Sequence, residues 1–171
     1  MSRKMSKQAK SIFIRNFVFG VEDSLVSTVG LLAGVAAADV ERQTILLTGG
    51  VLIAVEALSM GVGSLLSESF AEEYVERSTG TDGRSLAGAV IMFISYALAG
   101  FIPLLPYALL GREYAFTTSI TASCVALFLL GFVGSRYFGA NGLKTGLRML
   151  LLGGGAIAVG ILVGRLLHVS L

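Results

Sequence analysis

Long apolar runs alternate with short polar segments along the whole chain. Each run has at least 20 residues, which is enough for an α-helix to cross the hydrocarbon core of a bilayer. We therefore expect one all-α integral membrane domain over residues 1–171. Five membrane-spanning helices are predicted, at residues 12–38, 44–66, 86–110, 115–134 and 145–167.

The polar segments define the ends of these spans. Residues 1–11 are basic and polar, so we interpret them as an interfacial or disordered arm. Residues 67–85 form the longest polar stretch inside the chain. Shorter turns or links are expected at residues 39–43, 111–114 and 135–144. None of these connections is long enough to add a second domain.

Composition agrees with a membrane protein. Of the 171 residues, 54% are hydrophobic and only 14% are charged, whereas a soluble domain carries roughly 25% charge. The net charge of +2 does not indicate a nucleic-acid partner. The N-terminus resembles a cleaved signal peptide, but two acids inside its first apolar run argue that the run is retained as a helix.

The distribution of Lys and Arg predicts the orientation in the membrane. Of the 13 such residues, ten lie on the side of the N-terminus and only Arg42, Arg112 and Arg165 lie on the other. Basic residues collect on the cytosolic side, so we expect a cytosolic N-terminus and an external C-terminus. Five spans cannot form two equal inverted halves, so a symmetric path would need a second copy of the chain.

Three carboxylates lie at membrane depth: Glu22 and Asp23 in the first span, and Glu56 in the second. A central Asp costs roughly 2.5–3.5 kcal/mol on insertion scales, so such acids are candidates for function. Met60 follows Glu56 by one helical turn, and a carboxylate with a thioether suits Fe²⁺ and its neighbours. In the alternative interpretation, the first two acids pair with a base such as Arg15, and Met60 fills a packing gap.

Glycines mark the faces on which helices can approach closely. Gly30 and Gly34 in the first span, and Gly160 and Gly164 in the last, form two GxxxG pairs. Such pairs are sites of close helix crossing. The sequence leaves open whether these crossings lie within one protomer or between two.

A second group of acids follows the second span. Glu68, Glu72 and Glu76 recur every four residues, with Glu73 adjacent, so a continued helix would stack them on one face. Like charges at this spacing repel, and a bound cation is one explanation. A solvated acidic face, with Arg77 and Arg84 as partners, is the other.

Three segments together carry a family resemblance. They are GVEDSLVSTVGLLAGV at residues 20–35, EALSMGVGSLLSESFAEEY at residues 56–74, and AGFIPLLPY at residues 99–107. The chain resembles the vacuolar iron transporter family. The hallmarks are an Asp-Gly-Leu-type element in the first helix, a Ser-Met-Gly-x-Gly element in the second and a proline pair in the third. In this chain they correspond to Asp23-Ser24-Leu25, Ser59-Met60-Gly61-Val62-Gly63, and Pro103 with Pro106.

The resemblance implies a five-helix, homodimeric exporter that moves Fe²⁺, and often Mn²⁺, out of the cytosol in exchange for protons. It also implies that Asp23 and Met60 line the ion path at the dimer centre. Glu56 is assigned only by its spacing. The long metal-binding insert of plant-type members is missing between helices 2 and 3, where the acids from Glu68 to Glu76 would be a reduced version. The resemblance therefore leads us to expect a short, prokaryotic-type member in the cell membrane, or in the vacuolar membrane of a eukaryote.

Two other functions fit the sequence less well. An intramembrane hydrolase would need a second catalytic Asp at membrane depth or an activated Ser, and the other Asp residues lie in polar connections. A non-transporting adaptor or scaffold would leave Asp23, Glu22 and Glu56 without a purpose. We therefore expect a transporter rather than an enzyme, with no prosthetic group. Its expected partners are a second copy of itself, divalent metal ions, protons and membrane lipid.

Overall fold

The computed structural model describes residues 2–76, 83–137 and 141–169. Over these residues it is all-α, and each of its five helices is long and apolar enough to cross a membrane. Large apolar side chains such as Leu98 and Leu151 are 66% and 76% exposed, as lipid-facing residues would be. The predicted class is therefore confirmed. The helices are α1 (Ser2–Ala37), α2 (Arg42–Glu76), α3 (Gly83–Leu109), α4 (Arg112–Tyr137) and α5 (Gly142–Val169).

Two helices extend well beyond the predicted spans. Of the two interpretations of the N-terminal arm, the disordered one is wrong, because α1 already begins at Ser2. Likewise, α2 continues to Glu76 through most of the predicted polar stretch. Neither extension contains Gly or Pro, and both are rich in residues with good helix propensity. Residues 77–82 and 138–140, which belong to the predicted polar links, lie outside the described residues.

The turns at the other end of the bundle are short. Only residues 110 and 111 separate α3 from α4, so this turn is shorter than the predicted turn at residues 111–114. Glu113, which was expected in the turn, lies in the first turn of α4. Asp39, between α1 and α2, has a φ of 58°, a left-handed conformation that Asp tolerates better than most residues. Arg42 at the start of α2 donates to the carbonyl oxygen of Tyr107 at 2.6 Å and also to that of Ala108. These carbonyls belong to the last turn of α3, so the contact satisfies acceptors that the helix end leaves open.

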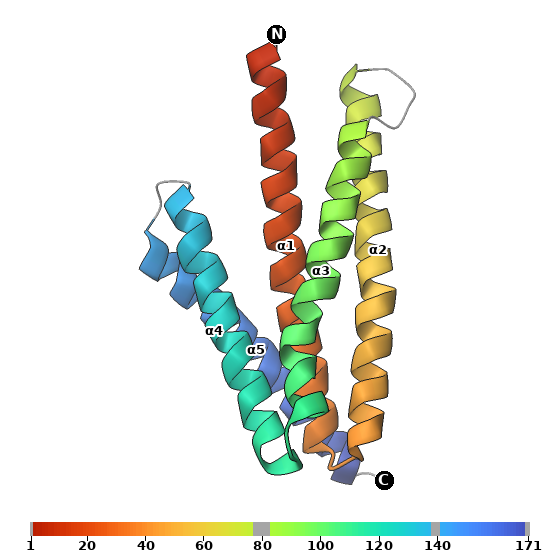
Figure 1. Ribbon diagram of the computed structural model, residues 1–171, viewed down its shortest axis with the longest axis vertical. Helices are drawn as coiled ribbons and strands as arrows, with labels where there is room; N and C mark the ends of the chain where they lie inside the picture. Colours follow the sequence, from red (N-terminus) through yellow and green to blue (C-terminus); the bar gives the residue numbers. More distant parts are fainter. Residues whose placement is uncertain (1, 77–82, 138–140, 170–171) are drawn as a thin grey trace.

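Helix α1 is the centre of the bundle, because it packs extensively against both α3 and α5. Helix α3 in turn lies between α1 and α2, and α4 packs against α5 and α3 (Figure 1). The two termini lie at opposite ends of the bundle, as expected for five antiparallel crossings (Figure 1). We call these the N-terminal end and the C-terminal end of the bundle.

The two GxxxG pairs pack against each other within one protomer. A Cβ atom on Gly34 of α1 would lie 2.6 Å from the carbonyl oxygen of Gly160 in α5. Cβ atoms on Gly160 and Gly164 would clash in the same way with the backbone of Gly30 and Gly34. The structure therefore resolves the alternative that the sequence left open. This glycine face of α1 is occupied by α5.

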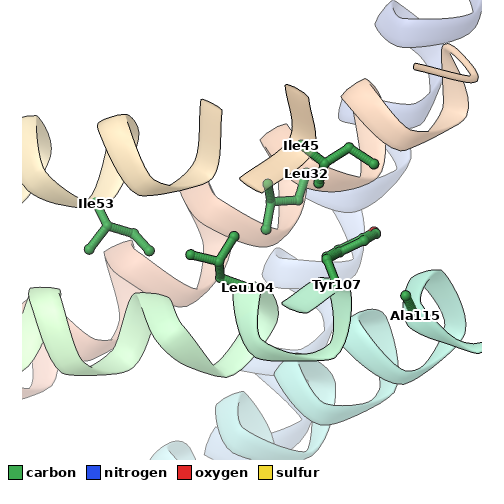
Figure 2. Close-up of a cluster of buried hydrophobic side chains, with 6 residues drawn as sticks. All are labelled: Leu32, Ile45, Ile53, Leu104, Tyr107 and Ala115. Atoms are coloured by element: carbon green, nitrogen blue, oxygen red, sulfur yellow. The ribbon is translucent and has the colours of Figure 1, made fainter. Parts of the chain in front are cut away.

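An apolar cluster closes the C-terminal end of the bundle (Figure 2). It joins side chains from α1, α2, α3 and α4, all less than 9% exposed. In lipid, close van der Waals packing of this kind is a principal source of helix association. The cluster consists of Leu32, Ile45, Ile53, Leu104, Tyr107 and Ala115.

Candidate metal path

Two of the predicted intramembrane acids lie near enough to interact in the middle of the bundle. Asp23 of α1 and Glu56 of α2 are both half-buried and interact electrostatically with one another. Tyr96 of α3 is fully buried between these helices, and its hydroxyl lies 2.8 Å from the Ser27 hydroxyl of α1. Tyr96 also interacts electrostatically with both acids. Three helices therefore contribute to one polar cluster at membrane depth.

Ser24 replaces the Gly that the family resemblance leads us to expect after Asp23, and the structure gives it a role. Its side chain is fully buried, and its hydroxyl donates a hydrogen bond of 2.7 Å to the carbonyl oxygen of Tyr96. The facing residue of α3 is Gly100, whose absent Cβ would lie 3.0 Å from that hydroxyl. Ser24 thus anchors α1 to α3 beside the polar cluster.

Glu22 does not share the position of its neighbour. Successive residues of an α-helix are rotated by about 100° around its axis, so Glu22 points to a different face of α1 from Asp23. Its side chain is half-buried. The bundle thus brings together Asp23 and Glu56, but not all three of the acids predicted at membrane depth.

Asp23 and Met60 line different hollows within one chain. A groove of about 710 Å³ between α1 and α5 is lined by Asp23, Ser27 and the glycines of the crossing. A second cavity, of about 570 Å³, lies among α1, α2 and α3 and contains Met60. Met60 is one turn of α2 closer to the N-terminal end than Glu56. The second cavity is lined by Arg15, Asn16, Phe19, Met60, Gly63, Ser64, Ser67 and Met92.

A hydrogen-bonded network surrounds Glu68 near this second cavity. The Glu68 side chain is only 6% exposed, and its Oε1 accepts from Arg15 at 2.6 Å and from Asn16 at 2.9 Å. The same Asn16 amide group donates to the Ser64 hydroxyl at 3.0 Å. Arg15 was considered as a partner for Glu22 and Asp23, but the structure pairs it with Glu68.

The other acids of this segment are arranged differently. Glu72 is half-buried and accepts a hydrogen bond of 2.9 Å from the Ser85 hydroxyl of α3, whereas Glu73 is exposed. The side chains of Glu76 and Arg77 lie outside the described residues. The helix that would stack these acids is present, but Glu68 and Glu72 do not lie on one solvated face. They contact α1 and α3 instead.

No group of three or more His, Cys, Asp or Glu side chains that could hold a metal ion occurs within the described part of this single chain. Asp23 and Glu56 form a pair, and Glu68 contacts Arg15 and Asn16.

Comparison with known protein families matches residues 14–82 and 75–165 to the VIT family. The chain belongs to the VIT family. The resemblance drawn from the three motifs is thereby confirmed, and the match extends over nearly all of the five helices.

The relatives of this VIT family member are vacuolar iron transporters and their homologues. It is 30% identical to vacuolar iron transporter homolog 1 of Oryza sativa subsp. japonica, over 92% of this chain and 74% of that protein. It is 29% identical to vacuolar iron transporter homolog 4 of Arabidopsis thaliana, over 93% and 84%. Identity to vacuolar iron transporter 1 of Arabidopsis thaliana is 22%, over 91% and 86%. These names describe transporters, in agreement with the expectation that this chain is not an enzyme.

Several polar residues of the path were missed by sequence reasoning. Asn16, Ser64 and Tyr96 each connect two helices through a side chain. A usable signal existed for Asn16, because an amide inside an apolar span needs a partner. Met92 gave no such signal, since methionine is a common filler of apolar interiors.

Proposed function

We propose that this chain transports a divalent transition metal, Fe²⁺ with Mn²⁺ as a second substrate, across the membrane in exchange for protons. Membership of the VIT family and relatives named as iron transporters support metal transport. The observation that carries the proposal is that Asp23 and Glu56, from two spanning helices, lie close enough to interact electrostatically. Acids at such a depth mark ion paths by default.

Asp23, Glu56 and Met60 supply the ligands along this path. The two carboxylates provide the negative charge that offsets the hydration lost by the ion. The thioether of Met60 favours Fe²⁺ and similar metals over harder ions such as Mg²⁺. Glu22 adds a further negative charge beside Asp23, on a neighbouring face of α1.

A homodimer completes the site. One chain offers only a pair of acids in the middle of the bundle, and a two-fold axis would supply each ligand twice. The glycine crossing between α1 and α5 lies within one chain, so we place the partner on the exposed apolar side of α2. Apolar residues such as Val55 and Val62, 58% and 54% exposed, lie on that helix.

Proton exchange follows from the chemistry of the ligands. Carboxylates must be deprotonated to bind a metal ion, so metal and protons compete for one site. With the N-terminal end in the cytosol, as the Lys and Arg distribution predicts, Glu68, Glu72, Glu73 and Glu76 lie at the cytosolic mouth. There they concentrate cations, and the metal leaves the cytosol towards the C-terminal end.

Transport in proteoliposomes tests the proposal. Fe²⁺, Mn²⁺, Co²⁺ and Zn²⁺ are offered in parallel, with a pH probe inside. We expect Fe²⁺ movement coupled to a pH change, and near-complete loss of both in Asp23→Asn, which keeps the shape but removes the charge. Glu41→Gln, an exposed acid in the turn after α1, is the matched control and should transport normally. Wild-type rates in Asp23→Asn would show that the path lies elsewhere.

A further inference from the structure

Glu68 is a buried carboxylate that lies apart from the Asp23 and Glu56 pair. It is placed where α1, α2 and α3 meet, and only 6% of its side chain is exposed. Its Oε1 accepts two hydrogen bonds, whereas its Oε2 is buried and has no hydrogen-bond partner among the described residues. A buried carboxylate oxygen without a partner is unusual in proteins and needs an explanation, such as a bound ion or water.

The missing side chain of Gly88 makes room for this carboxylate. A Cβ atom on Gly88 of α3 would lie 2.9 Å from Glu68 Oε2 and 2.6 Å from Asn16 Nδ2. Any larger residue would therefore collide with the carboxylate. On the other side of the network, Asn16 and Ser64 also line the cavity that contains Met60. The network thus borders the proposed metal path.

Arg15 is the cation that Glu68 holds in this structure. Its side chain is 64% exposed, and it also lines the mouth of the same cavity. Because most of its side chain is exposed, Arg15 can swing away from Glu68 without becoming buried. Glu68, in contrast, is fixed by burial and cannot follow.

We infer that Glu68, with oxygens of Asn16 and Ser64, binds the incoming divalent metal at a second site, and that Arg15 competes with the metal for it. The inference rests on the proposed transport function and deepens it. Carboxylate, amide and hydroxyl oxygens form a ligand set for a partly hydrated divalent ion. Asn16 now donates through Nδ2, so in the loaded site its amide turns to present Oδ1.

The site leads towards the middle of the bundle. Met60 and Met92, from α2 and α3, line the cavity beyond Ser64. Their thioethers accept a transition metal more readily than Mg²⁺ or Ca²⁺. A metal released from the oxygen ligands would thus meet soft ligands before it reaches Glu56. Arg15 returns to Glu68 once the metal has moved on, which closes the mouth behind it.

Substitution of the two ion-pair partners should have opposite effects on metal binding. The test uses the full-length chain in detergent, with Asp23→Asn as background to remove the central site. Mn²⁺ is the probe, because its EPR spectrum distinguishes bound from free ion. Arg15→Gln removes the competitor and should tighten Mn²⁺ binding about tenfold, given the size of short-range charge interactions near a protein surface. Glu68→Gln should abolish this binding.

A purely structural ion pair predicts another result. Both substitutions would then lower the melting temperature, and neither would tighten Mn²⁺ binding; unchanged or weaker binding in Arg15→Gln overturns the inference. Arg136→Gln removes an exposed positive charge from α4 and controls for general electrostatics. If Glu68→Gln fails to fold, Arg15→Gln alone still decides. Absence of wild-type transport would instead refute the proposed function, so the two failures are distinguishable.

Discussion

The two ends of the bundle are held together by different kinds of contact. At the C-terminal end, apolar residues such as Leu32, Ile45 and Leu104 interlock four helices. At the N-terminal end, α1, α2 and α3 meet through the ion pair and hydrogen bonds of Glu68. Apolar packing offers no group that an ion could replace, whereas each polar contact has a partner that a cation or proton can exchange. We therefore call the C-terminal end, with its apolar cluster, the fixed end of the bundle. The N-terminal end, where a cation or proton could replace Arg15 on Glu68, is the exchangeable end.

The proposed path runs between these ends. Asp23 and Glu56 lie between the Glu68 network and the apolar cluster, at the level of Tyr96. A transporter needs a part that keeps its helices in register and a part that responds to its substrate. If the chain works as proposed, the apolar cluster and the glycine crossing take the first role, and the polar network takes the second.

The largest effect is expected at the fixed end. Gly34→Val places a branched side chain where a Cβ would already lie 2.6 Å from the backbone of Gly160. Backbone cannot yield as a side chain can, so overpacking should cost at least about 1–3 kcal/mol and separate α1 from α5. Size-exclusion profiles and melting temperature in detergent should show loss of the folded protein. Gly155→Val, on an exposed position of α5 with open space around it, is the control and should fold.

The sequence was sufficient to predict five apolar helices and the neighbouring positions of Asp23 and Glu56. Apolar runs predict helices reliably in lipid, because every backbone polar group there must be satisfied within the segment. Asp23 and Glu56 stood out because acids are rare in such runs. The continuation of α2 to Glu76 was not predicted as a span, since hydropathy marks where a helix leaves the membrane, not where it ends.

The environment of Glu68 was beyond sequence reasoning. Its burial depends on Asn16, which is 52 positions away, and on the missing side chain of Gly88. Neither contact leaves a periodic trace in the sequence. The pairing of the two GxxxG motifs was equally undecided, because a glycine face shows that a helix approaches closely but not which helix it is.

An intermediate effect is expected at the exchangeable end. Met60→Leu keeps the volume of the side chain but removes its sulfur, so Fe²⁺ transport should fall several-fold more than Mn²⁺ transport. The ratio of the two rates in proteoliposomes is the measurement. Met149→Leu is the control, because its sulfur lies against Gly131 at the contact of α4 and α5, away from the path. Equal losses for both metals would mean that Met60 only fills space.

The smallest effect is expected from the outer acids. Glu72, Glu73 and Glu76 extend α2 beyond the Glu68 network, and Glu73 is exposed. Exposed charges attract cations weakly and over distances limited by salt, roughly 8–10 Å at physiological ionic strength. Replacing all three with Gln should therefore raise the apparent KM for Fe²⁺ about two-fold at low salt, leave the maximal rate unchanged and lose its effect at high salt. Transport measured across metal and salt concentrations checks this. A fall in maximal rate, or an effect that persists at high salt, would place these acids with Glu68 as direct ligands rather than as a screened outer charge.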